Sequence, residues 1–347
     1  MRSIKITTMR IYGIDLSMEK FDVNFIDERG NDRSKTVKNS LVPISKFLES
    51  LPDDCLLVAE HTGVYGDLLL YLSNQVGVSI SFMSGYTIKH SLGLIKGKSD
   101  PVDARRIREY GERFFDKLVC TVYEGETMKE LRELYVLRAQ LVKSRKTLAT
   151  SETGRKYQPV QSISVHKHVE QAIKALGTEI AEVEREMLAL IQSNAALRNN
   201  YEVVTSIKGI AQVTATDLLI KTGNFQVIDT ARKAASYAGV CPFPNASGTM
   251  VGKSKISPFG DKDLKTLLYM AAMTAVHHNK EYNLYYQRKK MEGKPHFLIM
   301  NNVANKLLRM IYSIVRSQTP WSETYMCLDP RESKQSIKIN SSDKKVA

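Results

Sequence analysis

The stretch "MRIYGIDLSMEKFDVNFID" (residues 9–27) decides the fold of the N-terminal part of the chain. Its first half is rich in apolar residues and ends at a tight turn. After the turn, Phe21, Val23 and Phe25 alternate with polar neighbours. Strict alternation is the period of a half-buried strand, so the stretch predicts two strands around a turn.

Three further segments extend this pattern. The apolar run "CLLVAE" (residues 55–60) ends in an acid and is typical of a buried central strand. A helical segment follows in "HTGVYGDLLLYLSNQVG" (residues 61–77), and then a strand in "VSISFM" (residues 78–83). The strand–helix–strand order predicts an α/β domain that ends near residue 125.

The next part of the chain has a different period. Two runs of residues repeat at spacings of three and four, which predicts a heptad seam on each of two helices. The runs are Leu134, Leu137, Leu141, Ser144 and Leu148, then Val169, Ile173, Leu176, Ile180, Val183, Met187 and Leu190. An antiparallel hairpin within one chain and a dimerising coiled coil both fit this pattern, and they do not exclude each other.

The changes of pattern divide the chain into four parts. We expect an α/β domain over residues 1–125, coiled-coil or dimerisation helices over 126–200, a mostly α-helical domain over 201–325, and a flexible tail over 326–347.

Composition points to a polyanionic partner. Lys and Arg number 50 against 37 Asp and Glu, which gives a formal net charge of +13. The four cysteines are scattered without zinc-binding spacing, which indicates reduced thiols in the cytoplasm. With no signal peptide and no apolar run long enough for a bilayer, we expect a cytoplasmic protein without a membrane partner.

Two aspartates three residues apart, Asp100 and Asp103, lie in "GKSDPVDARRIREYG" (residues 97–111). They are suited to capping the helix that follows. They also lie on one face of its first turn, where a divalent cation would relieve their mutual repulsion. Capping and metal binding can coexist, because each carboxylate has two oxygens.

Other acids favour the metal. Asp15 ends the first strand and Glu60 ends the central strand, so the four acids together fit an RNase H-like metal centre. Their hard oxygen ligands suit Mg²⁺ or Mn²⁺. On this interpretation Arg105 and Arg106, just behind the two aspartates, would bind phosphate.

The sequence resembles the DEDD-type transposases of the insertion sequence 110 family, relatives of the Piv DNA invertase. The resemblance rests on the four acids, on "AEHTGVYG" and "KSDPVDARRI" around three of them, and on the blocks "VVTSIKGIAQVTATDLLIKTGN" and "ASYAGVCPFPNASGTMVGKSKISPFGDKDLKTLLYMAA". It covers nearly everything from residue 10 to 321. It implies a RuvC-like N-terminal domain, a coiled-coil spacer and a mostly α-helical transposase domain with a helix-hairpin-helix-like entry.

The resemblance also implies a nucleophilic serine just before a glycine, at Ser247 of "NASGTM". The family motif has a second serine where this chain has Ala246, so Ser247 is the only candidate in the dipeptide. The rival candidates outside the dipeptide are Ser206, Ser254 and Ser257. We expect Ser247 to lie in a tight, exposed loop bounded by prolines.

Nucleic-acid contacts are expected at Lys208 in the hairpin block and at Lys253, Lys255, Lys262 and Lys265 in the signature block. The sequence departs from the family pattern at Ala211, where the hairpin usually has glycine, and at Pro258 and Phe259, where cations are usual.

The function implied is a site-specific recombinase that moves its own insertion sequence. A bridge RNA would pair with donor and target DNA, Mg²⁺-binding acids would lie near the scissile phosphate, and Ser247 would form a phosphoserine intermediate. Strand exchange implies a homodimer that assembles into a tetramer. Two other classes remain open: a RuvC-like structure-specific endonuclease that uses water, and a non-catalytic nucleic-acid-binding protein.

Overall fold

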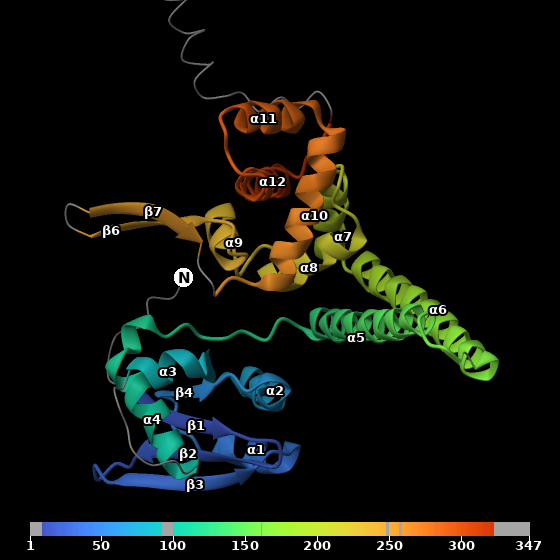
Figure 1. Ribbon diagram of the computed structural model, residues 1–347. Coiled ribbons are helices and arrows are strands. Elements are labelled where there is room, and N and C mark those ends of the chain that lie inside the picture. Colours follow the sequence, from blue (N-terminus) through green and yellow to red (C-terminus); the bar gives the residue numbers. More distant parts are fainter. Residues whose placement is uncertain (1–8, 92–99, 161, 248–249, 257–258, 323–347) are drawn as a thin grey trace, which may run out of the picture. The chain divides into compact units, whose positions relative to one another are not determined.

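The computed structural model describes residues 9–91, 100–160, 162–247, 250–256 and 259–322 (Figure 1). The chain forms two compact units, divided after Glu124, which we call unit 1 and unit 2. This division lies next to the expected end of the α/β domain. The further boundary near residue 200 stays a prediction, and the tail expected over 326–347 lies outside the described residues.

Unit 1 is a mixed sheet with helices. Its elements are β1 (Arg10–Leu16), β2 (Lys20–Ile26), β3 (Asp32–Lys38), α1 (Leu41–Glu49), β4 (Cys55–Glu60), η1 (Gly63–Gly66), α2 (Asp67–Val76), β5 (Ser79–Met83), α3 (Gly85–Ser91), α4 (Asp100–Arg113) and η2 (Phe115–Lys117). The strand order is β3-β2-β1-β4-β5. β1, β4 and β5 are parallel, whereas β2 pairs antiparallel with both β1 and β3.

The four strands expected from the sequence are present, and β3 is an addition. Its sequence is polar, and Val37 is its one buried residue. Apolar alternation is therefore absent from β3, and its position at the sheet edge explains why a polar segment can form a strand there.

The two faces of the sheet bury separate cores. Tyr12, Ile14 and Leu16 of β1 pack on one face in a cluster that includes residues of α1 and α2. Ile11 packs on the other face in a cluster that includes Ile107 of α4. Successive strand residues point to opposite faces, so Asp15 falls on the face that α4 covers.

Unit 2 is mostly helical. Its elements are α5 (Glu126–Arg155), α6 (Ile163–Ser193), α7 (Ala195–Thr205), α8 (Gln212–Thr222), α9 (Ala231–Tyr237), β6 (Pro242–Ser247), β7 (Met250–Ile256), α10 (Lys262–His278), α11 (Lys280–Met291) and α12 (His296–Ser317). The strands β6 and β7 form an antiparallel ribbon, which the sequence did not predict.

The heptad helices pack against each other within the chain. α5 and α6 lie side by side as a hairpin (Figure 1), and Arg138 on α5 pairs with Glu184 on α6 at 2.6 Å. Ile180 and Met187 are buried in the core of unit 2. Packing within one chain, as in the hairpin interpretation, therefore explains why these two heptad positions are apolar. Association of the same helices with a second chain stays a prediction.

No helix among the described segments is long and apolar enough to cross a bilayer. The cysteines described, Cys55, Cys120 and Cys241, are free thiols.

Candidate functional site

Asp15 and Glu60 lie on neighbouring parallel strands at the same end of the sheet. β1 and β4 pair through Ile14 and Ala59, so the next residue on each strand is the acid. Val58 belongs to the core cluster under α4, and Glu60 lies two residues further on the same face. Both carboxylates are therefore on the face of the sheet that α4 covers.

Close packing orients α4 over this face. A Cβ on Gly13 of β1 would overlap the carbonyl oxygen of Ala104, and a Cβ on Gly111 would lie 2.8 Å from the side chain of Ile11. The later part of α4 thus lies over the start of β1, and the earlier part lies further along the strand. The helix runs antiparallel to β1, and its first turn points toward the end that carries Asp15.

That first turn contains the other two acids. Asp103 is half-buried and pairs through Oδ1 with Nη1 of Arg106 at 2.6 Å. Asp100 opens the helix, but its side chain lies outside the described residues. Asp103 therefore shares its face of unit 1 with Asp15 and Glu60, and Oδ2 is the oxygen of Asp103 not used in this ion pair.

Glu60 is positioned by a glycine that the sequence analysis did not single out. A Cβ on Gly85, the first residue of α3, would overlap Oε1 of Glu60. Any other residue at position 85 would force the end of the Glu60 side chain to move from this position. Its signal in the sequence is a Gly two residues after the end of β5, at the start of a short helical segment.

The donor set consists of carboxylate oxygens, which suits a hard divalent cation. Across the part of the chain that the structure describes, no group of three or more His, Cys, Asp or Glu side chains is arranged to hold a metal ion. The acids thus fit a metal site by the chemistry of their oxygen atoms and by their position on one face of the sheet.

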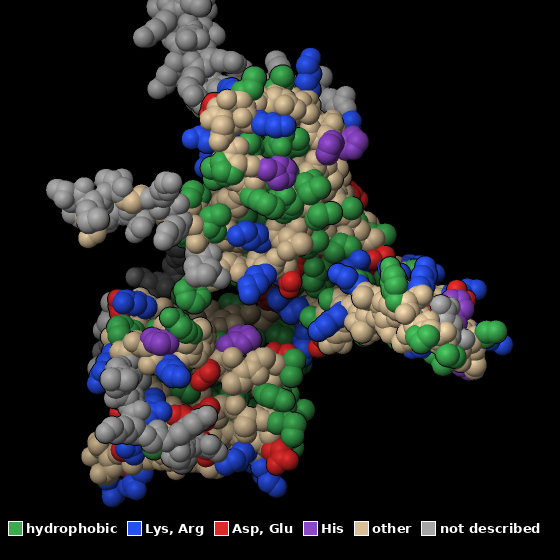
Figure 2. All heavy atoms as spheres, viewed as in Figure 1, with side chains coloured by type: hydrophobic (Ala, Val, Ile, Leu, Met, Phe, Trp, Pro, Cys, Tyr) green, Lys and Arg blue, Asp and Glu red, His purple; other side chains and the backbone are tan. Residues whose placement is uncertain are grey.

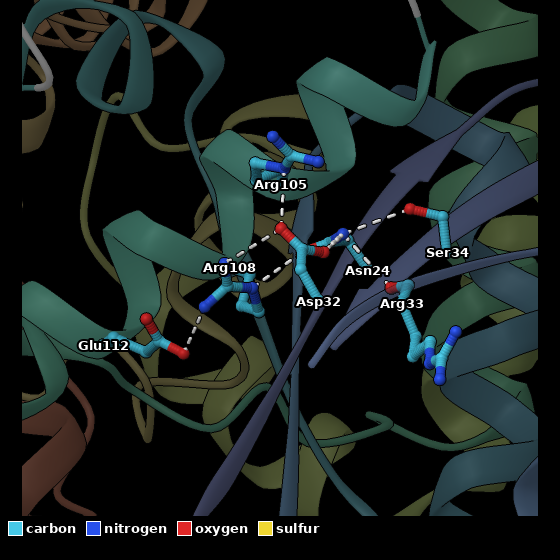
Figure 3. A network of polar contacts seen from close by, with 7 residues as sticks. All are labelled: Asn24, Asp32, Arg33, Ser34, Arg105, Arg108 and Glu112. Carbon is cyan, nitrogen blue, oxygen red and sulfur yellow. Dashed lines mark hydrogen bonds and ion pairs between the residues drawn. The ribbon is translucent and has the colours of Figure 1, made fainter. Parts of the chain in front are cut away.

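Arg105 and Arg108 of α4 contact carboxylates (Figure 3). The buried side chain of Arg108 donates to Asn24 at 2.6 Å and to Glu112 at 2.6 Å, and it lies 3.8 Å from Asp32. Arg105 pairs with the same Asp32 at 2.8 Å. This network ties α4 to β2 and β3. Arg105 and Arg106 each already have an acidic partner, with which a phosphate would have to compete. Phosphate binding by these two residues therefore stays a prediction.

Ser247 is the last residue of β6 and pairs in register with Met250 of β7. Its side chain is exposed. The expectation of a loop is corrected here, because Ser247 belongs to a strand of the ribbon. Among its rivals, Ser254 lies in β7 and Ser257 lies outside the described residues.

The other rival, Ser206, is engaged in structure. Its hydroxyl donates to the carbonyl of Val203 at 2.6 Å and accepts from the backbone N–H of Trp321 at 2.7 Å. Both bonds hold the chain after α7, so the structure gives Ser206 a structural role.

The lysines of the signature block occupy two elements. Lys253 and Lys255 lie in β7, and their side chains are outside the described residues. Lys262 and Lys265 lie in the first turns of α10, and neither has an ion pair within the described segments. Lys208 lies in the turn between α7 and α8.

Two family models match the chain. The DEDD transposase model of the IS110 type matches residues 12–152, and the model described as the transposase IS116/IS110/IS902 family matches residues 201–287. The chain belongs to the IS110 transposase family. The first match spans the four acids, and the second spans Ser247 and the lysines of α10.

Several similar proteins cover nearly the whole of this family member. The pilin gene-inverting protein of Moraxella bovis is 25% identical over 90% of this chain and 97% of its own length. The transposase for insertion sequence element IS1111A of Coxiella burnetii is 22% identical over 94% of this chain and 93% of its own. The DNA transposase or recombinase class predicted from the sequence is confirmed.

One ionic cluster of this IS110-family chain escaped the sequence analysis. Lys221 Nζ lies 3.0 Å from Asp217 and 2.7 Å from Asp261, and Asp261 caps α10 by accepting from the backbone N–H of Leu264 at 2.8 Å. Burial raises the pKa of Asp217 despite the nearby Lys221. The signal was the i,i+4 Asp–Lys pair in a helix that is otherwise rich in apolar residues.

Proposed function

We propose that this transposase is a site-specific DNA recombinase that cleaves and rejoins strands through a phosphoserine at Ser247, with Asp15, Glu60, Asp100 and Asp103 as metal ligands. The observation that carries the proposal is the placement of Asp15 and Glu60 on adjacent strand ends, on the face covered by α4.

The topology of unit 1 supports our assignment of an RNase H-like fold. The sheet has the order β3-β2-β1-β4-β5, with only β2 antiparallel to both of its neighbours, and a helix crosses the face that bears the acids. We assign the fold on this order together with the DEDD match over residues 12–152.

The four carboxylates would hold Mg²⁺, or Mn²⁺ in its place. A divalent cation there would offset the negative charge of a phosphate and lower the pKa of a hydroxyl bound to it. The chain's own contribution is to fix the ligands: Gly85 leaves space for Glu60, and Arg106 fixes one oxygen of Asp103.

The exposed hydroxyl of Ser247 would attack the scissile phosphate, forming an O–P bond as the bond to one sugar oxygen breaks. The phosphoserine keeps the energy of the phosphodiester, so the reverse attack by a sugar hydroxyl rejoins strands without ATP. Lys253 and Lys255 would stabilise charge on the phosphate.

The partners we propose are donor DNA, target DNA and a noncoding bridge RNA that supplies sequence specificity by base pairing. The net charge of +13 supports a nucleic-acid partner. A dimer and then a tetramer would bring strands together, and Leu137, 40% exposed on the α5 seam, is available to a second chain. Such an enzyme would act in the cytoplasm at the nucleoid.

The experiment is to trap the protein on nicked DNA in Mg²⁺ and to map the modified residue by mass spectrometry. We expect the adduct at Ser247. Ser247→Ala should lose the adduct and recombination but keep DNA binding, whereas the matched variant Ser254→Ala, in the same ribbon, should keep both. Asp15→Asn and Glu60→Gln should remove the adduct while circular dichroism shows an unchanged fold.

Three results would contradict the proposal. An adduct at another residue would reassign the nucleophile. Cleavage without any adduct would favour the nuclease that uses water. Full activity of Asp103→Asn in Mg²⁺ would return that residue to helix capping.

A further inference from the structure

An aromatic cluster lies where α10, α11 and the start of α12 meet. It consists of Tyr269, Tyr286, His296 and Phe297. The two ring nitrogens of His296 are hydrogen-bonded to the hydroxyls of Tyr269 at 3.1 Å and Tyr286 at 2.9 Å. A neutral imidazole has one donor and one acceptor, so both are used and the ring is fixed. The cluster is therefore ordered by polar contacts from three helices.

The ring of Phe297 lies on the outside of this cluster. It stacks on Tyr269 with centroids 6.0 Å apart and planes 26° apart, yet Phe297 is 74% exposed. The neighbouring Ile299 and Met300 are buried and supply the core contacts of α12. Phe297 does not contribute to the core. Its ring packs against Tyr269 and otherwise presents an aromatic surface to solvent.

Basic residues are frequent in the segment that forms the cluster. Lys265 and Lys262 precede Tyr269 by one and two helical turns on the same side of α10. Residues 262–298 hold seven Lys and Arg against three Asp and Glu. Figure 2 shows hydrophobic side chains intermixed with Lys, Arg and His over α10, α11 and α12. A second copy of the same basic surface would be repelled, so the charge favours an anionic partner with flat rings.

We propose that the aromatic cluster stacks unpaired bases of a single-stranded nucleic acid, with the adjacent phosphates at Lys265 and Lys262. Every base has a π-face that an aromatic ring can cover, and bases inside a duplex are not available for this contact. The inference rests on the proposed function only in that the enzyme handles nucleic acid. It adds a site for a strand segment that pairing leaves open, in DNA or in RNA.

The test is binding of the full-length protein to three fluorescent oligonucleotides of one sequence: single-stranded DNA, single-stranded RNA and duplex DNA. Phe297→Ala should weaken single-strand binding by on the order of tenfold, since one lost stack accounts for about that much. Duplex affinity should not change, and neither should the salt dependence of single-strand binding, because no phosphate contact is lost. The DNA and RNA arms show which strand the site prefers.

Matched variants separate stacking from a general apolar contact. Phe297→Tyr should bind as the original protein does, and Leu284→Ala, which removes a 60% exposed side chain of α11 outside the cluster, should have no effect. Phe297→Leu binding single strands at full affinity would overturn the proposal. An equal loss for duplex and single strand, or a change of mass in light scattering with Phe297→Ala, would overturn it too.

The result is distinguishable from failure of the recombinase mechanism. Phe297→Ala should still form the Ser247 adduct on a nicked duplex, and Ser247→Ala should still prefer single strands as strongly as the original protein. Loss of the adduct on duplex DNA with Phe297→Ala would place the cluster in the cleavage machinery and contradict a separate stacking site.

Discussion

The helices α4 and α10 both carry cationic side chains, but these side chains have different surroundings. Arg105 and Arg108 on α4 pair with Asp32, and Arg106 pairs with Asp103. Lys262 and Lys265 on α10 have no ion pair among the described residues. Net charge alone therefore does not tell which cations can bind phosphate.

The difference has a physical origin in burial. The Arg108 side chain is only 8% exposed, and a guanidinium removed from water needs several acceptors, which Asn24, Asp32 and Glu112 supply. Lysines on an exposed helix end keep their hydration and need no partner. The first group stabilises the fold, and the second is available for binding.

The largest effect is expected at Arg108. Arg108→Met leaves the buried side-chain oxygen of Asn24 without its donor and removes the cation that pairs with Asp32 and Glu112, so we expect a loss of about 3–5 kcal/mol in the free energy of unfolding of unit 1, measured by urea titration. The control is Arg105→Met, which removes a 50% exposed side chain and should cost under about 1 kcal/mol. Equal losses for the two variants would break the comparison between structural and available cations.

A smaller and pH-dependent effect is expected at Lys221, a half-buried cation of unit 2. Lys221→Met leaves the buried Asp217 without its ion pair, at a cost of about 3 kcal/mol near pH 8. The pKa of Asp217 is raised in the folded protein. The loss of stability in Lys221→Met should therefore be complete above the pKa of Asp217 in the folded protein. It should shrink as the pH falls toward the pKa of Asp217 in the unfolded chain, because below that value Asp217 is protonated in both the folded and the unfolded state.

The measurement for Lys221 is urea unfolding at pH 8 and near pH 4.5. Adding Asp217→Asn to Lys221→Met should recover part of the stability at pH 8 and little at the lower pH. A loss for Lys221→Met that grows on acidification would show that Asp217 does not carry the effect.

The smallest effect on stability is expected at the two lysines in the first turns of α10, where the effect on nucleic-acid binding should be clear. Lys262→Ala and Lys265→Ala should each leave stability nearly unchanged and reduce the slope of log K against log salt by about 0.7 on single-stranded DNA. Arg105→Ala should change the slope less, because Asp32 competes for the guanidinium. An equal change at Arg105 would show that it leaves Asp32 for phosphate, as the sequence suggested.

Local periodicity explains which elements were predictable. β1, β2, β4 and β5 alternate or form apolar runs, so each strand carries its own signal. β3 is polar and forms because β2 offers it an edge, and the β6–β7 ribbon combines prolines with a register shift near Phe243. Neither has a pattern of its own, so Ser247 was expected in a loop.

The sequence by itself determined which residues end the strands and open the helix, and so it determined the candidate acids Asp15, Glu60 and Asp103. It also determined the heptad period of α5 and α6. Tertiary structure decided that these acids share one face, because Gly13 and Gly85 admit α4 and the Glu60 carboxylate at close range. It also decided that the heptad residues Ile180 and Met187 are buried within unit 2 and that Arg105, Arg106 and Arg108 pair with acids. The reason is that a period shows only that a side chain is buried, whereas the partner that buries or neutralises it lies far away in the sequence.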